Sequence, residues 1–298
     1  MARALLIANP DAARTDPRVI RSVRDVLTRR GLTVEVAGTT ASEDATELAR
    51  RGVRDGAEIV AVYGGDGTTM RAVRGIVGLD VALGVIPGGT GNVLAGNLRI
   101  PRSPVRAAEV VASGNVRALD LGRVERADGV HYFAVNCGAG ADAILMAATS
   151  RQAKRRWGFG AYVVQAWQQL GAVAPVPHRI TVDGELLETG AATVLVANCG
   201  EVIPPFLKLG AGIAPDDGLL DVVVLSATGV AQSIGVLWQL VRGTRNGSGR
   251  VQYARGHEVR IEATPARPVQ LDGELAGSTP LVAVVMPAAI KVLVPRGC

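Results

Sequence analysis

Residues 59–69 read Ile-Val-Ala-Val-Tyr-Gly-Gly-Asp-Gly-Thr-Thr, and this stretch decides the fold class of the chain. Its first four residues, Ile59 to Val62, form a short apolar run of the kind that is buried on both faces of a parallel sheet. Three glycines follow within five residues, and a helical pattern begins after them. A buried strand that leads through glycines into a helix predicts an α/β sheet in which ligands bind where the strands end.

The same arrangement occurs again one strand later. Ala82 to Ile86 is a second buried strand, and it leads into Pro87-Gly88-Gly89-Thr90-Gly91-Asn92 and a helical segment. Backbone N–H groups of such loops approach an anion closely, and the helix start adds its positive dipole end. Two loops on strands of one sheet therefore predict a polyphosphate site, although each loop could also be a tight turn without a ligand. Asp66 favours a ligand, because a carboxylate beside a phosphate needs Mg²⁺ or a hydrogen-bonding role.

The sequence around these loops divides into two domains. At 298 residues the chain is long enough for two domains that each bury a core. Residues 1–117 alternate apolar strands with helices, including one that begins at Asp16-Pro17 and one that begins at Ser42. Residues 118–280 contain strands punctuated by Gly, Asp and Pro, which predicts a mainly antiparallel, β-rich second domain. The segment 281–298 opens with an apolar run and is expected to return to the first domain.

Composition and charge exclude several classes of protein. Hydrophobic residues make up 48% and charged residues 20%, which is typical of a folded globular protein rather than a disordered one. No apolar run reaches the roughly 20 residues that cross a bilayer, and the apolar part of the N-terminus is too short for a signal peptide. Three scattered cysteines, Cys137, Cys199 and Cys298, favour free thiols in a reducing cytoplasm. The net charge of +5 suits an anionic partner, but the aromatic pattern of RNA-binding domains is not evident, so we expect no nucleic acid partner.

The two glycine loops resemble the motifs of a known enzyme family. Gly64-Gly65-Asp66-Gly67-Thr68 and Pro87-Gly88-Gly89-Thr90-Gly91-Asn92 look like the catalytic domain of diacylglycerol kinases, sphingosine kinases and bacterial lipid kinases. A P-loop enzyme is excluded, because the GxxxxGK[ST] motif is absent. The resemblance extends over nearly the whole chain, in the same order, through four further segments: Asn9-Pro10, Leu119-Asp120-Leu121-Gly122, Pro215-Asp216-Asp217-Gly218-Leu219-Leu220 and Leu271-Asp272-Gly273-Glu274.

The resemblance implies a fold, an activity and a nucleotide site. The fold would be an N-terminal α/β domain with a parallel sheet, similar to that of NAD kinases and phosphofructokinases, followed by a β-sandwich domain. The activity would be ATP-dependent phosphorylation of a lipid hydroxyl, with diacylglycerol as the expected substrate and phosphatidic acid as the product. ATP would contact residues of the loops and of the first two strand ends: Asn9, Thr39, Gly64, Gly65, Asp66, Gly67, Thr68, Thr69, Gly89, Thr90, Gly91 and Asn92.

The resemblance also assigns metal ligands and a catalytic base. Three carboxylates would form an aspartate–water–Mg²⁺ arrangement at the phosphates: Asp66, Asp120 and Asp272. Glu274 would be the general base. Bacterial members hold a second, structural Mg²⁺, and here its ligands would be the Asp217 carboxylate and the backbone carbonyls of Ala214 and Leu219.

The residues around Glu274 support proton transfer independently of the resemblance. A carboxylate within hydrogen-bond reach can accept the proton of an alcohol as the bond to phosphorus forms. Asp272 and Glu274 are two residues apart, so on a continuous strand both side chains would point to one face. The competing interpretation is a hairpin with Asp-Gly at its tip, and Asp183-Gly184-Glu185 fits the same description.

Two positions depart from the family pattern. Met70-Arg71 stands where an Asn-Glu pair often follows the first loop, and Val93 stands where many bacterial diacylglycerol kinases have an aspartate. Sphingosine kinases also carry an apolar residue there. Because of these departures, a second interpretation stays open: a degenerate protein that binds lipid or nucleotide without catalysis. An NAD kinase is a further alternative, because NAD kinases share the first loop and the two-domain layout, although the late Asp272-Gly273-Glu274 segment favours a lipid kinase.

A lipid kinase without a spanning helix must work at a membrane surface. Within residues 151–171 basic side chains precede aromatic ones, a combination that suits an anionic leaflet: Arg151, Lys154, Arg155, Arg156, Trp157, Phe159, Tyr162 and Trp167. A solvated charge cluster followed by a core helix explains this segment equally well. A second helix, 230–242, is expected in the core or as a lid over acyl chains. We therefore expect a cytoplasmic protein, peripherally associated with the inner face of the membrane, with a homodimer left open.

Overall fold

The computed structural model describes residues 1–140, 174–227 and 250–297, apart from residues 11, 13, 14, 41, 205 and 206, together with residues 232, 235, 236, 239 and 240. The chain forms two compact units. Unit 1 comprises Met1–Asp120 and Ala288–Cys298, and unit 2 comprises Leu121–Pro287, so these limits differ by a few residues from those drawn from the sequence. The predicted membrane segment 151–171 and most of the predicted helix 230–242 lie outside the described residues.

Unit 1 contains a parallel sheet. Its strands are β1 (Arg3–Ala8), β2 (Thr33–Gly38), β3 (Ile59–Gly64) and β4 (Ala82–Pro87), followed by the C-terminal end of β18 (Leu281–Val294). They lie in the order β2-β1-β3-β4-β18, and each neighbouring pair in this order is parallel. Strands β3 and β4 are buried along almost their whole length, as their apolar runs predicted.

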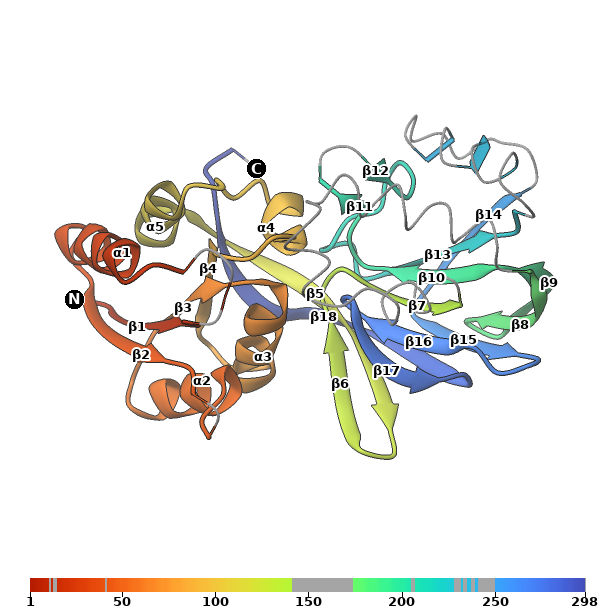
Figure 1. Cartoon of the computed structure of the whole chain (residues 1–298), viewed down its shortest axis with the longest axis horizontal. Helices are drawn as coiled ribbons and strands as arrows, with labels where there is room; N and C mark the ends of the chain where they lie inside the picture. The colour runs from red at the N-terminus through yellow and green to blue at the C-terminus, as the bar shows by residue number, and fades with distance from the viewer. Residues whose placement is uncertain are drawn as a thin grey trace. The chain divides into compact units, whose positions relative to one another are not determined.

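Among the described residues, unit 1 also contains five helices: α1 (Pro17–Arg29), α2 (Ala45–Arg54), α3 (Asp66–Ile76), α4 (Val93–Asn97) and α5 (Pro104–Ser113). Helices α1 and α5 pack together on one face, and α2 and α3 pack together on the other (Figure 1). The predicted start of α1 is confirmed, because the Asp16 carboxylate accepts the N–H of Arg18 at 2.7 Å. The predicted start at Ser42 is wrong. Asp44 caps α2 instead, since its carboxylate reaches two free N–H groups of the first turn, whereas the Ser42 hydroxyl pairs with Thr40.

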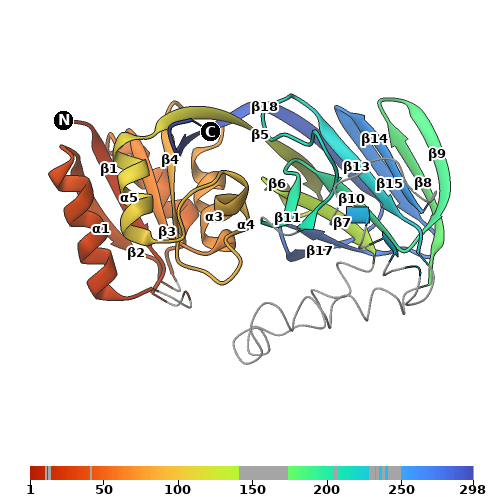
Figure 2. The same cartoon turned by 90° about the horizontal axis from the view of Figure 1, so that it is seen from above.

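Unit 2 is a β-sandwich (Figures 1 and 2). One sheet has the order β14-β13-β10-β7-β16-β17, and in the other β18 pairs with β15, β15 with β8 and β8 with β9. The strand pairs of unit 2 in the described part of the chain are antiparallel, as predicted. Their bounds are β5 (Asn115–Arg126), β6 (Gly129–Phe133), β7 (Asn136–Gly140), β8 (Val176–Val182), β9 (Glu185–Ala191), β10 (Thr193–Ala197), β13 (Leu220–Leu225), β14 (Val251–Gly256), β15 (Glu258–Ala263), β16 (Pro268–Leu271) and β17 (Glu274–Ser278), with a small separate pair, β11 (Glu201–Ile203) and β12 (Leu207–Lys208).

The core of the sandwich fixes the strands that carry the late acidic residues. Apolar side chains from both sheets form one buried cluster, among them Phe133, Val194, Val222 and Ile261. The Phe133 ring fills the space beside Gly122 so completely that a Cβ there would lie 1.9 Å from a ring carbon. Close packing of this kind holds strand positions firmly.

Two further expectations concern thiols and membrane spans. Cys137 and Cys199 are free and buried, which confirms the prediction for the two cysteines within the described residues. In the part of the chain that the structure covers, no helix is both long enough and apolar enough to cross a bilayer.

Candidate functional site

The predicted nucleotide residues lie at one edge of the sheet of unit 1. Asn9 directly follows β1, Thr39 directly follows β2, Gly64 ends β3, and residues 88–92 follow β4. Because these strands are parallel, their carboxyl ends meet at a single edge. The fold therefore gathers segments that are far apart in the sequence.

The two glycine loops lie directly against each other. The N–H of Gly88 donates to the carbonyl of Gly64 at 2.8 Å. A Cβ built on Gly89 would lie 2.6 Å from the Cα of Gly65, which is closer than real Cβ atoms approach backbone. Only glycine allows the loops to lie in contact at these positions. Gly65 also caps α3, so the N–H groups of the first turn of this helix open beside the loops.

Side chains of the loops hold this arrangement in place. The amide of Asn9 donates to the hydroxyl of Thr68 at 2.9 Å, which ties the end of β1 to the first loop. The Asn92 side chain accepts the N–H of Gly89 at 2.9 Å and donates to its carbonyl at 2.7 Å. Asn92 has a φ of 51°, a left-handed conformation that asparagine tolerates well. Both loops are thus preformed.

Asp66 begins α3 and faces the second loop. One carboxylate oxygen accepts the N–H of Leu94 at 3.3 Å, and a Cβ on Gly91 would lie 2.9 Å from the other oxygen. Although the residue keeps some exposed surface, burial of the carboxyl raises its pKa above the ordinary value of 3.8. Nearby backbone N–H groups offset only part of this effect. A cation at this position would stabilise the carboxylate.

Asp120 lies on β5 and is almost completely buried. Its carboxylate accepts the N–H of Ala288 at 2.8 Å. Ala288, whose N–H makes this hydrogen bond, has a φ of 50°, which is an uncommon conformation for alanine. Asp120 therefore holds the β18 backbone within unit 1, whatever further role it has.

Asp272 and Glu274 lie on the hairpin between β16 and β17. Asp272 and Gly273 both have positive φ, 45° and 85°, which is the conformation of a type I′ turn. The expectation that both carboxylates lie on one continuous strand is therefore wrong, because the chain reverses at Asp272-Gly273 and only Glu274 is in the strand. Glu274 is exposed. The carboxylate of Asp272 instead accepts three backbone N–H groups, from residues 134–136, at 2.7, 2.9 and 3.0 Å.

Comparison with known proteins agrees with this architecture. A model of the diacylglycerol kinase catalytic domain matches residues 3–124, and a model of the YegS C-terminal NAD kinase beta sandwich-like domain matches residues 135–294. The chain is 31% identical over 281 residues to a diacylglycerol kinase of Mycobacterium tuberculosis (strain CDC 1551 / Oshkosh), covering 91% of this chain and 87% of that one. The chain belongs to the diacylglycerol kinase and YegS-like lipid kinase family.

Two more relatives of this lipid kinase family cover almost the whole chain. A diacylglycerol kinase of Bacillus subtilis (strain 168) is 28% identical over 300 residues, which span 99% of this chain and 97% of that one. A crystal structure of a diacylglycerol kinase from Bacillus anthracis str. Sterne superposes with a TM-score of 0.78 at 20% identity and covers 99% of this chain and 97% of that one. At this identity the second likeness concerns the fold.

Asp217, the only carboxylate predicted to bind a structural Mg²⁺, is already paired with an arginine. Asp217 accepts the N–H of Leu219 at 3.1 Å with one carboxylate oxygen, and its other oxygen lies 3.3 Å from Arg255. The same guanidinium pairs with the buried Asp221 at 2.7 Å and donates to the carbonyl of Gly212 at 2.7 Å. A second cation on Asp217 would lie beside the first, so the residues as arranged do not fit Mg²⁺. Across the described ranges, no three His, Cys, Asp or Glu side chains form a metal-binding group.

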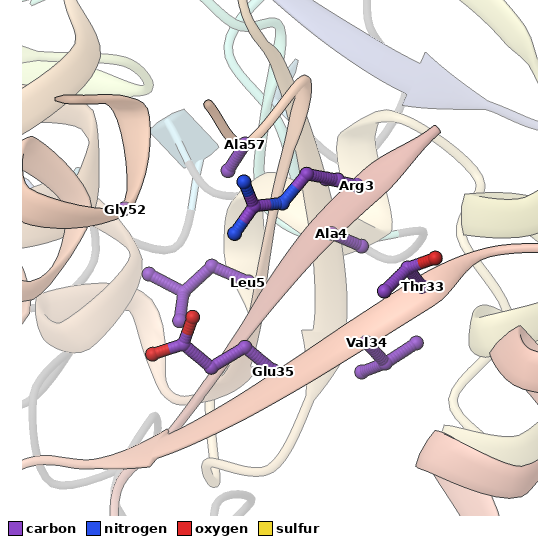
Figure 3. A pocket seen from close by; sticks show the side chains of 8 residues that line it. All are labelled: Arg3, Ala4, Leu5, Thr33, Val34, Glu35, Gly52 and Ala57. Carbon is purple, nitrogen blue, oxygen red and sulfur yellow. The ribbon is translucent and has the colours of Figure 1, made fainter. Parts of the chain in front are cut away.

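A cavity of about 250 Å³ in unit 1 lies away from the glycine loops. Figure 3 shows the side chains that line it, from the first residues of β1 and β2 and from the region of α2: Arg3, Ala4, Leu5, Thr33, Val34, Glu35, Gly52 and Ala57. The starts of parallel strands lie at the sheet edge opposite to their carboxyl ends. None of the predicted site residues lines this cavity.

Sequence reasoning missed the segment that Asp272 holds. Residues 134 and 135 connect β6 to β7 and Asn136 begins β7, and their composition does not mark a functional site. The buried Gln270 was missed as well, although its amide donates to the Asn136 side chain at 2.7 Å. Neither contact leaves a local signal, because the partners are more than 130 residues apart.

Proposed function

We propose that this member of the lipid kinase family transfers the γ-phosphoryl group of ATP to the hydroxyl of diacylglycerol and forms phosphatidic acid. The observation that carries the proposal is the pair of glycine loops that meet at the carboxyl ends of β3 and β4, next to the start of α3. Glycine loops beside a helix N-terminus favour a polyphosphate. Family membership and relatives with the name diacylglycerol kinase support the lipid as acceptor.

In this proposal, ATP binds at the carboxyl ends of the parallel strands of unit 1. Backbone N–H groups of the two loops, residues 64–69 and 88–92, would donate to the phosphates where they are not already paired. The N–H groups of Thr69, Gly88 and Gly89 donate within the loops and hold their shape. Asn9, Thr39 and Thr90 would lie at the border of the site. Thr90 is exposed, whereas Thr68 and Thr69 are buried and fix the first loop. Preformed donors require little reorganisation when the charge on the phosphoryl group spreads in the transition state.

Asp66 fits a magnesium ion carried by the nucleotide. Mg²⁺ commonly binds through one or two carboxylates, phosphate oxygens and water, so a cluster of three protein ligands is unnecessary. Burial penalises the charge of Asp66, and a cation would relieve that penalty. When bound, Mg²⁺ would neutralise charge on the transferring phosphoryl group. Asp120 and Asp272 were predicted beside it, and both carboxylates make hydrogen bonds to backbone N–H groups.

The proposal gives Glu274 the role of general base. The lipid hydroxyl oxygen attacks the γ-phosphorus, the bond from that phosphorus to the β–γ bridging oxygen breaks, and ADP leaves with the electron pair. The hydroxyl proton passes to the Glu274 carboxylate. Exposure of this side chain suits a group that must meet a substrate.

We further propose that the protein is cytoplasmic and contacts the inner leaflet peripherally. The basic and aromatic residues of 151–171 support this part of the proposal by their composition. Diacylglycerol stays in the membrane, so the enzyme must come to it.

Radiolabelled ATP with a panel of acceptors tests the proposal. We expect transfer to detergent-dispersed diacylglycerol, read by thin-layer chromatography, and none to soluble NAD. Glu274→Gln should lower the rate by about 10²–10⁴-fold, the range of general acid–base catalysis, with an unchanged melting temperature. Glu185→Gln, at the corresponding exposed position of the β8–β9 hairpin, is the matched control and should be fully active.

Other outcomes would replace the proposal. Phosphorylation of NAD would identify an NAD kinase, and transfer to a sphingoid base alone would change the acceptor. ATP binding without transfer to any acceptor would indicate a degenerate binding protein, consistent with Arg71 and Val93.

A further inference from the structure

The sequence Asp-Gly-Glu occurs twice in the chain, and both copies form the same turn. Asp183 and Gly184 have φ values of 47° and 91°, and Asp272 and Gly273 have values of 45° and 85°. Each pair closes a two-residue hairpin, β8–β9 in one case and β16–β17 in the other. The chain thus contains a structural twin of its proposed catalytic turn.

In both turns the aspartate binds backbone N–H groups of another segment. Asp183 accepts from His257 at 2.9 and 3.0 Å and from Glu258 at 2.8 Å. Asp272 accepts from the three consecutive residues 134–136 at 2.7, 2.9 and 3.0 Å. Several short bonds to one carboxylate hold it in a single orientation. Each aspartate therefore anchors the tip of its hairpin to a neighbouring segment of the chain, residues 257 and 258 in one case and residues 134–136 in the other.

Further hydrogen bonds immobilise the tip that precedes Glu274. The N–H of Asp272 donates to the carbonyl of Asn136 at 2.9 Å. The N–H of Gly273 donates to the side chain of Gln270 at 2.7 Å, and Gln270 in turn donates to the side chain of Asn136 at 2.7 Å. Gln270 is 3% exposed, so water does not compete for these bonds. The N–H groups of Asp272 and Gly273 are therefore both held, and Glu274 follows directly.

The segment that receives Asp272 is itself held from the other side. Ala134 accepts the side-chain amide of the buried Asn198 at 2.9 Å. The carbonyl of Val135 accepts the N–H groups of Asn198 and Cys199 at 2.9 and 3.0 Å. Residues 134–136 are therefore a rigid support between the end of β10 and the hairpin.

We propose that Asp272 is the positioning residue of Glu274: its carboxylate clamps the hairpin tip to residues 134–136 and so fixes the backbone that presents the base. This inference rests on the proposed function of Glu274. It gives Asp272 a role in place of the magnesium arrangement, because the carboxylate already serves three N–H donors.

Asp272→Asn and Asp183→Asn form a matched pair of variants. Each replaces a carboxylate by an amide that has one acceptor oxygen fewer, in the same turn conformation. We expect Asp272→Asn to lower kcat for lipid phosphorylation at least ten-fold, with the KM for ATP and the Mg²⁺ concentration for half-maximal rate unchanged within two-fold. Both variants should lower the melting temperature by similar amounts, but Asp183→Asn should leave kcat unchanged.

A double variant shows whether Asp272 acts through Glu274. If it does, adding Asp272→Asn to Glu274→Gln should not lower the residual rate further. Additive losses would overturn the proposal, as would a raised Mg²⁺ requirement of Asp272→Asn, which would restore the magnesium role. Equal kcat in the two aspartate variants would also overturn it. A wild-type protein that phosphorylates no lipid would instead refute the proposed function, so the two failures are distinct.

Discussion

Asp66 carries the largest electrostatic cost in the nucleotide site. Its carboxyl is penalised by burial, and the N–H groups of residues 92–94 compensate only in part. A carboxylate kept in such a place lowers stability in the free protein, and active sites commonly accept that cost where a ligand relieves it. The residue is therefore a point where stability and the proposed activity oppose each other.

Replacing Asp66 by asparagine should separate the two properties. The pKa of Asp66 is higher in the folded chain than its ordinary value of 3.8, so the folded state binds more protons above that pH. Stability is therefore fullest below the unfolded pKa and falls as pH rises through the folded pKa. At neutral pH Asp66→Asn should melt no lower than the wild type. Its stability relative to the wild type should decline as the pH is lowered through the raised pKa of Asp66 towards 3.8, and should stay constant below that value. Phosphoryl transfer should fall at least 100-fold.

Thermal melts at several pH values and the lipid assay check this prediction. Asp25→Asn, at an exposed position of α1, serves as the control, since it should leave both the rate and the pH profile unchanged. A variant that melts well below the wild type at neutral pH would show that the Asp66 charge stabilises the fold.

The glycine loops are the element on which the nucleotide proposal depends. Their contact is between backbones, so no side-chain rotamer can adjust when a Cβ is added at Gly89. Overpacking of this kind costs about 1–3 kcal/mol.

Gly89→Ala should therefore push the second loop away from Gly65. We expect a loss of about 1–3 kcal/mol in the free energy of unfolding and a KM for ATP raised at least ten-fold. Urea titration and initial rates measure the two effects. Gly190→Ala is the matched control, because a Cβ there meets nothing within 4 Å, and it should change neither quantity. Normal ATP kinetics for Gly89→Ala would mean that the loops do not bind the phosphates.

In the β13–β14 pair, the Arg255 side chain supplies the positive charge that neutralises Asp221. Arg255→Met should cost about 3–5 kcal/mol, because it removes the cationic partner of Asp221, which is 1% exposed. Arg179→Met breaks an exposed ion pair with Glu188 and should cost less than about 1 kcal/mol. Chelation with EDTA should leave the melting temperature of the wild type unchanged. A fall of several degrees on chelation would indicate that a metal, rather than Arg255, neutralises this cluster.

Local signals explain which elements could be predicted from the sequence. Residues 59–62 and 82–86 were expected as buried strands and lie within β3 and β4, because the apolar runs that predict them lie within the elements themselves. Ser42 was expected to begin the second helix, but Asp44, two residues later, is also a residue type that caps helices, and the structure shows that it caps α2.

Long-range contacts explain the rest. The three donors to Asp272 lie 136–138 positions away, so a local pattern cannot distinguish an anchored turn from a free one. Arg255 was missed for the same reason, since Asp221 lies 34 positions before it and the pairing of β13 with β14 brings them together.

At the scale of the whole molecule, the proposed chemistry is divided between the units. The glycine loops and Asp66 belong to unit 1, and Glu274 with its anchor belongs to unit 2. Changes in the loops should therefore raise the KM for ATP, whereas changes around Glu274 should lower kcat. Neither unit alone contains all the residues of the proposal, which agrees with relatives that extend over both.

Access to a membrane lipid adds a requirement on the whole protein. Residues 151–167 combine four basic side chains with four aromatic ones, although they lie outside the described residues. A basic residue near an anionic leaflet contributes about 1 kcal/mol, and aromatic rings favour the interface.

Replacing Arg155 and Arg156 by glutamine and Trp157 by alanine should weaken membrane binding. The two charges alone correspond to about 2 kcal/mol, or roughly a thirty-fold loss of affinity for vesicles rich in phosphatidylglycerol. Sedimentation with those vesicles measures the loss, and added salt should reduce wild-type binding, because it screens surface charges. Arg24→Gln with Arg50→Gln, on the exposed surfaces of α1 and α2, removes the same charge elsewhere and should bind nearly as the wild type does. Equal sedimentation of both variants and the wild type would place the lipid-facing surface outside 151–167.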